Sequence, residues 1–202
     1  TNIVEASTGT SADIIERGET LGRITVPMLG LHNLSNALAA IAVARVLGVS
    51  FAQIAEHMPG FAGARRRFEH RGFYNEILFV DDYAHHPSEI QATLAAAQVQ
   101  RGGALPSGIE RKVVAVFQPH RYSRASTLLE EFSTSFQGAD RILVTDIYSA
   151  GETHTANITG EQVRNEIATH QPSTEYYPTL AAVNATLQTL LHPGAILIFT
   201  TA

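Results

Sequence analysis

The stretch EILFVDDYAHHP, residues 76–87, decides the fold class of this chain, because it joins a short buried strand to a polar loop and a proline-initiated helix. The strand in this stretch is EILFV, residues 76–80. Three further five-residue segments are similarly rich in β-branched or aromatic residues: VVAVF at 113–117, RILVT at 141–145 and AILIF at 195–199. Amphipathic stretches near residues 87–100, 125–137, 159–169 and 179–191 separate the strands. This alternation predicts an α/β fold with a Rossmann-like, mostly parallel sheet and helices on both faces.

The region before this sheet has a helical pattern. Residues 31–48, LHNLSNALAAIAVARVLG, are rich in Ala and Leu and end in glycine, which predicts a helix that begins near His32 or Asn33. A shorter helix is expected from Ser50 to about His57.

The segment MPGFAGA, residues 58–64, has the Pro and Gly content of a hinge. We therefore expect two domains. Residues 1–63 would be a fragment of a second α/β domain, and residues 64–202 a nearly complete α/β domain.

Composition excludes several classes of protein. The 202 residues carry 14 Lys+Arg against 19 Asp+Glu, so the net charge of -5 gives no electrostatic reason to expect nucleic acid. No apolar run is long enough to span a bilayer, and the start of the chain has no signal-peptide pattern. The absence of Cys fits a reducing compartment, so we expect a cytoplasmic protein without membrane insertion. Because the chain begins without Met, we expect it to be part of something longer.

Polar clusters follow three of the predicted strands directly. DDYAHHP occupies residues 81–87, QPHRYSR residues 118–124 and DIYSAGE residues 146–152. Ligands of parallel sheets bind beyond the carboxyl ends of the strands, so we expect all three clusters at one edge of the sheet.

The first cluster suits either a metal ion or a nucleotide. Its two carboxylates and two imidazoles lie within six residues, but the spacing is no zinc signature. A metal hydrolase using Asp81, Asp82, His85 and His86 is therefore a weak alternative. The structural alternative is that Asp81 or Asp82 caps the following helix.

Two groups of arginines are candidates for anion binding. Arg121 and Arg124 are three residues apart, so in a helical turn their planar guanidinium groups would share one face and suit carboxylates or phosphates. Near a helix N-terminus an anion would also relieve their repulsion with the helix dipole. Arg65, Arg66 and Arg67 follow the hinge; solvated surface is the favoured interpretation for the first two, whereas Arg67 lies at the entry to the first strand.

The amides of Asn33 and Asn36 are suited to the donor and acceptor edge of adenine, because side chains at i and i+3 can point the same way on a helix. Simple N-capping by Asn33 is the alternative, and on this motif alone it is favoured.

Five segments in this order, GLHNLSNALAAIAVA, PGFAGARRRFE, VDDYAHHPSEI, VFQPHRYSR and DIYSAGE, resemble the Mur ligase family from about residue 24 to the end. QPHRYSR after DDYAHHP resembles the branch that adds L-alanine to UDP-N-acetylmuramate; the branch that recycles muramyl tripeptide is the alternative. The resemblance implies an ATP-dependent carboxylate–amine ligase of peptidoglycan precursor synthesis. It phosphorylates the lactyl carboxylate and lets the alanine amine attack the acyl phosphate, while Mg²⁺ screens the phosphates.

The resemblance also implies site residues. It places four residues against ATP: Asn33 and Asn36 at the adenine, Asp82 at the ribose and Arg67 at the phosphates. It places four on the side that receives L-alanine and the muramyl carboxylate: Tyr83, His85, Arg121 and Arg124. The expected catalytic residues are Arg67, His85, Arg121 and Arg124.

The chain departs from the family pattern in what it lacks. It has no counterpart of the UDP-binding domain, of the GTxGKT phosphate loop or of the Glu and His that hold Mg²⁺, and Lys112 is its only lysine. We expect no metal ligands in this chain, with those for Mg²⁺ upstream of it, and no ligase activity from this chain alone. A non-catalytic α/β module that binds a small ligand is the non-enzymatic alternative.

Overall fold

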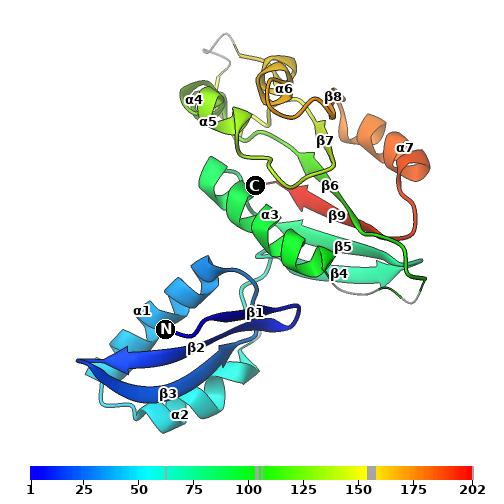
Figure 1. Ribbon diagram of the computed structural model, residues 1–202. Helices are drawn as coiled ribbons and strands as arrows, with labels where there is room; N and C mark the ends of the chain where they lie inside the picture. The colour runs from blue at the N-terminus through cyan, green and yellow to red at the C-terminus, as the bar shows by residue number, and fades with distance from the viewer. Residues whose placement is uncertain (62, 103–104, 106, 154–157, 202) are drawn as a thin grey trace. The chain divides into compact units, whose positions relative to one another are not determined.

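The computed structural model describes residues 1–61, 63–102, 105, 107–153 and 158–201, and these form two compact units (Figure 1). The N-terminal unit is Thr1–Arg65 and the C-terminal unit is Arg66–Ala202. The predicted boundary after Gly63 lies two residues earlier. Among the described residues, no helix is both long and apolar enough to cross a membrane.

The N-terminal unit is a three-stranded antiparallel sheet packed against two helices. Its strands are β1 (Val4–Ala6), β2 (Gly9–Glu16) and β3 (Glu19–Val26), in that order across the sheet. Its helices are α1 (Leu31–Val46) and α2 (Phe51–His57), followed by the 3-10 turn η1 (Met58–Gly60). The two predicted helices are confirmed. Strands were expected in this α/β fragment, but the three observed strands were not located from the sequence. They pair only with one another in the described chain.

The missed hairpin has a period-two signal. Ala12 and Ile14 on β2, and Ile24 and Val26 on β3, are buried against α1 and α2, while the residues between them are more exposed. The turn between the strands has positive φ at both Arg17 and Gly18, which suits a tight hairpin.

The C-terminal unit is built on a six-stranded sheet of order β4-β5-β9-β6-β7-β8 (Figure 1). Its strands are β4 (Glu69–Tyr74), β5 (Ile77–Asp82), β6 (Lys112–Phe117), β7 (Arg141–Val144), β8 (Thr174–Tyr176) and β9 (Ala195–Thr200). Only β4 is antiparallel to its neighbour; β5, β9, β6, β7 and β8 run parallel. The mostly parallel sheet and its four predicted strands are confirmed. β4 and β8 were missed, because β4 has no buried face and β8 has three residues.

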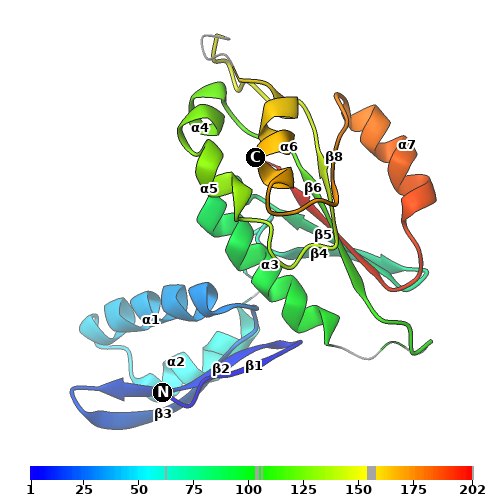
Figure 2. The same cartoon turned by 45° about the horizontal axis from the view of Figure 1, so that its top comes forward.

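Helices cover both faces of this sheet (Figure 2). They are α3 (Pro87–Arg101), α4 (Tyr122–Thr127), α5 (Leu129–Ser133), α6 (Gly160–Ala168) and α7 (Leu180–Leu190). Side chains of β6 alternate between the faces: Ala115 and Phe117 pack with α3 to α6, whereas Val114 and Val116 pack with α7. The predicted helix over 125–137 was wrong in its bounds, because Leu128 leaves helical geometry and divides the segment into α4 and α5.

Gly160→Ala tests the contact between α6 and β7. A Cβ at Gly160 would lie 2.3 Å from the Thr145 carbonyl oxygen and 2.8 Å from the Asp146 Cα, and neither backbone atom can move aside freely. We expect the substitution to lower the free energy of unfolding of the C-terminal unit by about 1–3 kcal/mol. The control Gly72→Ala, with nothing within 4 Å of its Cβ, should change it by less than about 0.5 kcal/mol.

Urea unfolding followed by tyrosine fluorescence measures this effect. All six tyrosines lie in the C-terminal unit and the chain has no Trp, so the signal reports that unit alone. Equal midpoints for the two variants would contradict the close approach of α6 to β7.

Candidate functional site

The loops after β5 and β6 leave the sheet at the same level. Asp82 of β5 and Phe117 of β6 are both in register with Thr200 of the intervening strand β9. The loops then meet, since the ring centroids of His85 and His120 lie 5.7 Å apart. The structure therefore brings two of the three predicted polar clusters together at one edge of the sheet.

The third cluster joins the same edge through an added β-bridge. His120 pairs with Tyr148, the Arg121 amide donates to the Tyr148 carbonyl (2.8 Å), and the Tyr148 amide donates to the Pro119 carbonyl (2.8 Å). The rings of His120 and Tyr148 lie 5.6 Å apart. We call six side chains at this edge the rim cluster: Tyr83, His85, His120, Arg121, Arg124 and Tyr148.

Asp82 ties the start of the unit to the β5 loop. It is 5% exposed, and its carboxylate accepts hydrogen bonds from the backbone amides of Phe68 (2.7 Å) and Ala84 (2.8 Å). Burial raises the pKa of Asp82, against the opposing effect of these two bonds. Asp82 therefore has a structural role in this loop, and its contact with a ribose stays a prediction.

The segment held by Asp82 carries backbone strain. Arg66 and Phe68 have φ of 56° and 48°, a region that non-glycine residues rarely occupy. The Arg66 carbonyl accepts from the Tyr83 amide (2.8 Å), and its amide donates to Glu69 (2.8 Å). Such strain persists only where neighbouring contacts fix the conformation, and it is concentrated at functional sites.

The arginines of this segment contact the β5 loop. The guanidinium carbons of Arg66 and Arg67 lie 5.1 and 5.9 Å from the Tyr83 ring centroid. Arg66 also pairs with Asp81 (3.4 Å), so the solvated-surface interpretation was wrong for Arg66. Arg67 pairs with Glu89 (3.4 Å) and its side chain is 45% exposed, which leaves it accessible to a ligand.

Glu89 organises the loop that presents His85. Its carboxylate accepts from the amides of His85 (3.1 Å) and His86 (3.2 Å), and His86 is the N-cap of α3. The predicted capping by Asp81 or Asp82 was therefore wrong. The Asp82 carboxylate instead accepts from the backbone amides of Phe68 and Ala84. Although burial raises the pKa of Glu89, the His85 amide and the other nearby donors outweigh it and lower the pKa overall.

The hydrogen bonds of His85 indicate its tautomer. Its Nδ1 lies 2.8 Å from the Tyr83 carbonyl oxygen, which can only accept, so Nδ1 carries a proton. In the neutral ring the lone pair is then on Nε2. A neutral His85 therefore has the nitrogen away from the Tyr83 carbonyl free to accept a proton.

Arg121 and Arg124 differ in their surroundings. Arg121 is exposed, has φ of 69° and is the N-cap of α4, and its guanidinium has no hydrogen bond or ion pair in the described chain. Nη1 of Arg124 donates to Nδ1 of His120 (3.1 Å). Glu152 lies at the start of α4, so the anion that we expected beside these arginines is supplied in part by the protein.

The surroundings of His120 favour its neutral form. Burial lowers its pKa below the ordinary value of 6.5, and the positive charges of Arg124, His85 and Arg121 lower it further, whereas Glu152 raises it. The Arg124 bond agrees with this direction, because Nδ1 accepts only when it is unprotonated.

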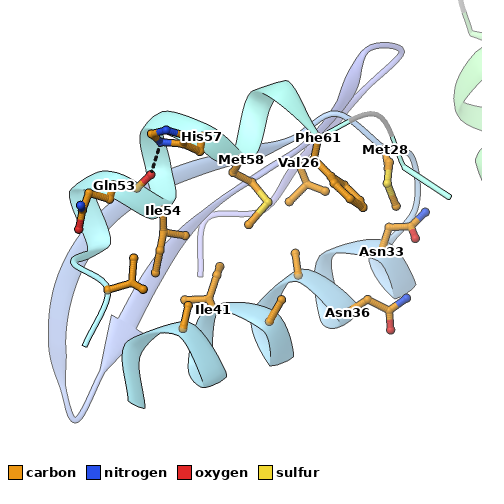
Figure 3. Close-up of a pocket in the computed structure, with 14 residues that line it drawn as sticks. Val26, Met28, Asn33, Asn36, Ile41, Gln53, Ile54, His57, Met58 and Phe61 are labelled. Carbon is orange, nitrogen blue, oxygen red and sulfur yellow. Dashed lines mark hydrogen bonds between the residues drawn. The ribbon is translucent and has the colours of Figure 1, made fainter. Parts of the chain in front are cut away.

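Asn33 and Asn36 lie in the other unit, at one end of a pocket of about 640 Å³ between α1, α2 and β3 (Figure 3). Asn33 is buried and donates its amide to the Leu29 carbonyl (2.8 Å). N-capping by Asn33 was wrong, since the N-cap of α1 is Gly30. Most of the lining is apolar: Val26, Met28, Ala37, Ala40, Ile41, Ala44, Val49, Ile54, Met58 and Phe61. Both the volume and the lining suit a flat organic base.

The described residues contain no group of three or more His, Asp or Glu placed to hold a metal ion. Asp81 and Asp82 are consecutive on β5, so their side chains point to opposite faces. The four residues of the metal-hydrolase alternative thus have no common donor set.

Three residues of this site had no role predicted from the sequence: His120, Tyr148 and Glu89. The first two were within quoted clusters but had no assigned role. Glu89 had a detectable signal, because an acidic residue three positions after a helix cap is typical of a capping box.

We expect Arg124→Gln to raise the pKa of His120, since it removes the positive charge that lowers this pKa most. Proton-detected NMR of the histidine rings should give a wild-type midpoint below 6.5 and a higher one in the variant. Arg141→Gln, an arginine paired with Glu175, is the control and should leave the midpoint unchanged. A midpoint in Arg124→Gln at or below that of the wild type would contradict the contact.

Comparison with known proteins identifies the family. Residues 66–202 match the family described as "Mur ligase, glutamate ligase domain". The chain is 47% identical over 198 residues to a UDP-N-acetylmuramate–L-alanine ligase of Gloeothece citriformis, covering 98% of this chain and 39% of that protein. It is 53% identical over 199 residues to the protein of that name from Trichormus variabilis, covering 98% and 39%. The similarity thus extends to residues before 24, which lie outside the motifs that resemble the family. The chain spans about two fifths of the length of these relatives.

Solved structures share the fold. A UDP-N-acetylmuramate-alanine ligase from Thermotoga maritima matches with a TM-score of 0.81 and 24% identity, covering 99% of this chain and 41% of that chain. A murein peptide ligase from Psychrobacter arcticus matches with a TM-score of 0.64 and 27% identity, covering 96% and 39%. With the family match over the whole C-terminal unit, these findings establish that the chain belongs to the Mur ligase family.

Proposed function

We propose that this chain is the part of an ATP-dependent ligase that receives L-alanine and the carboxylate of UDP-N-acetylmuramate. The observation that carries the proposal is the rim cluster, in which two arginines and two imidazoles from separate loops converge on one edge of a parallel sheet. Relatives that are 47–53% identical carry the name of this ligase, which supports the choice of substrates.

The arginines of the rim cluster suit the carboxylates of these substrates. A guanidinium fork forms two parallel charge-assisted hydrogen bonds with a carboxylate. Arg121 is exposed and unpaired among the described residues, so it can bind a substrate without losing an internal bond. We assign carboxylate binding to Arg121 and Arg124. Tyr83, whose ring centroid lies 5.0 Å from that of His85, is the further proposed substrate contact.

His85 is suited to remove a proton from the amine. L-alanine is an ammonium ion near neutral pH, and it must lose a proton before its nitrogen can attack a carbonyl carbon. Nε2 of neutral His85 can accept that proton, while Nδ1 keeps its bond to the Tyr83 carbonyl. We assign His85 as the catalytic base.

ATP would supply the phosphoryl group that activates the carboxylate. We assign its adenine to Asn33 and Asn36, because the pocket beside them has the size and apolar lining for a base. Asp82 and Arg67 remain the proposed contacts for the ribose and phosphates, and the ligands of Mg²⁺ are expected outside this chain. A cytoplasmic location likewise remains a prediction.

Two alternatives remain distinguishable by assay. A muramyl tripeptide recycling ligase would prefer a peptide to L-alanine, and the structural match to a murein peptide ligase keeps that substrate in the test. A non-catalytic module would bind a small ligand with no turnover. The full-length protein should form UDP-N-acetylmuramoyl-L-alanine and release phosphate from ATP; preferential use of the tripeptide, or no turnover at all, would contradict the proposal.

In the full-length protein, Arg121→Ala should lower kcat/KM for L-alanine by about 100-fold or more, as expected for the loss of a charge-assisted contact with the carboxylate of that substrate. Because its guanidinium has no partner in the described chain, the free energy of unfolding should change by less than about 0.5 kcal/mol. Arg71→Ala, another exposed arginine of the unit, is the control and should keep its activity within about 2-fold. Wild-type kinetics for Arg121→Ala would refute its role.

The 202-residue chain alone should show no turnover of ATP, UDP-N-acetylmuramate and L-alanine. Its sequence has no GTxGKT loop, and phosphate positioning with metal screening supplies most of the rate of phosphoryl transfer. Incorporation of labelled L-alanine into the sugar nucleotide measures this directly, and product above the level without protein would show that the chain is sufficient.

A further inference from the structure

Glu152 caps α4 from a distant loop. Its Oε2 accepts from the Ser123 amide (3.1 Å) and its Oε1 accepts from the Ser123 hydroxyl (2.5 Å). Arg121, the N-cap of α4, makes no capping bond with its own side chain. The carboxylate therefore satisfies an amide at the start of α4 that has no partner within the helix.

The capping contact completes a set of bonds between the loops after β6 and β7. The backbones of Arg121 and Tyr148 are already joined at 2.8 Å, and those of Tyr148 and Pro119 at 2.8 Å. The Glu152 amide donates to the Ser149 carbonyl (3.0 Å), which makes a turn in the loop after β7. Arg121 is thereby fixed between two attachment points, in a left-handed conformation that is disfavoured for arginine.

Charge acts in the same direction as these bonds. Arg121 lies at the positive end of α4, which disfavours a cation there. Glu152 places a negative charge at that end, and the Ser123 hydroxyl, followed by the Ser123 amide and the Arg121 charge, lowers its pKa. The carboxylate thus stays ionised while it holds the arginine loop.

We propose that Glu152 is a positioning residue that fixes the backbone of Arg121 and the start of α4, and thereby sets the rim arginines for the substrate carboxylate. Its effect on catalysis rests on the proposed function. Its effect on the loop does not, so the two parts are tested separately.

The first test is NMR of the 202-residue chain. In Glu152→Ala the backbone amide signal of Ser123 should shift, because both bonds from Ser123 to the carboxylate are lost. The Arg121 amide signal should shift as well, because its bond to the Tyr148 carbonyl lies in the loop that Glu152 fixes. In Glu152→Gln these shifts should be smaller, since the amide oxygen can still accept from the Ser123 amide. Glu130→Ala removes the same charge from an exposed position on α5 and is the control, with signals unchanged.

Ring titration of His120 separates charge from hydrogen bonding in the same samples. Arg124, Arg121, His85 and Glu152 are the charged groups that act on this imidazole. Because Glu152 alone among them favours the protonated ring, both Glu152→Gln and Glu152→Ala should lower the His120 midpoint, whereas Glu130→Ala should not.

The second test is kinetic, with the full-length protein. Glu152→Ala should raise KM for L-alanine by about 10-fold with kcat changed by less than about 3-fold, because a misplaced carboxylate site weakens binding. Glu152→Gln should keep KM within about 3-fold of the wild type. A purely structural role would reduce the folded fraction and leave the KM of the folded enzyme unchanged.

An unchanged KM in Glu152→Ala, or unchanged Arg121 and Ser123 signals, would overturn the proposal. If instead the wild-type full-length protein does not ligate L-alanine, the proposed function fails while the NMR results still decide whether Glu152 positions the loop.

Discussion

Parallel pairing of β5, β9 and β6 is the constraint on which the site depends. Because all three strands run in one direction, Asp82 and Phe117 end level with Thr200, and the loops that follow must leave the sheet at the same edge. The contact between His85 and His120 follows from this register. Backbone pairing thereby brings together side chains from two segments that lie more than thirty residues apart in the sequence.

Three carboxylates hold these loops in place in the same way. Asp82 bonds the amides of Phe68 and Ala84, Glu89 bonds two amides before α3, and Glu152 bonds the start of α4. Each is an ionisable side chain used as an acceptor for backbone donors that would otherwise lack partners. Left-handed backbone at Arg66 and Arg121 is tolerated because these bonds surround it.

Sequence alone predicted the sheet and the shared edge, because buried parallel strands are short continuous apolar runs and their order along the chain determines where polar loops emerge. It missed β4, which has no buried face, and the hairpin of β2 and β3, whose alternation was present but not used. The structural alternative for the first cluster placed helix capping on Asp81 or Asp82, whereas the N-cap of α3 is His86. The hydrogen bonds that Ser123 donates to Glu152 depend on tertiary contact, so no local pattern could reveal them.

The positions of the rim cluster are therefore set first by strand register and then by side-chain chemistry. The role proposed for it in an alanine-adding ligase depends on that convergence. The most direct measurement is the nuclear Overhauser effect between ring protons of His85 and His120 in the 202-residue chain. With ring centroids 5.7 Å apart, cross-peaks between the two imidazoles are predicted. Two assigned and well-resolved imidazoles without any mutual cross-peak would contradict the account.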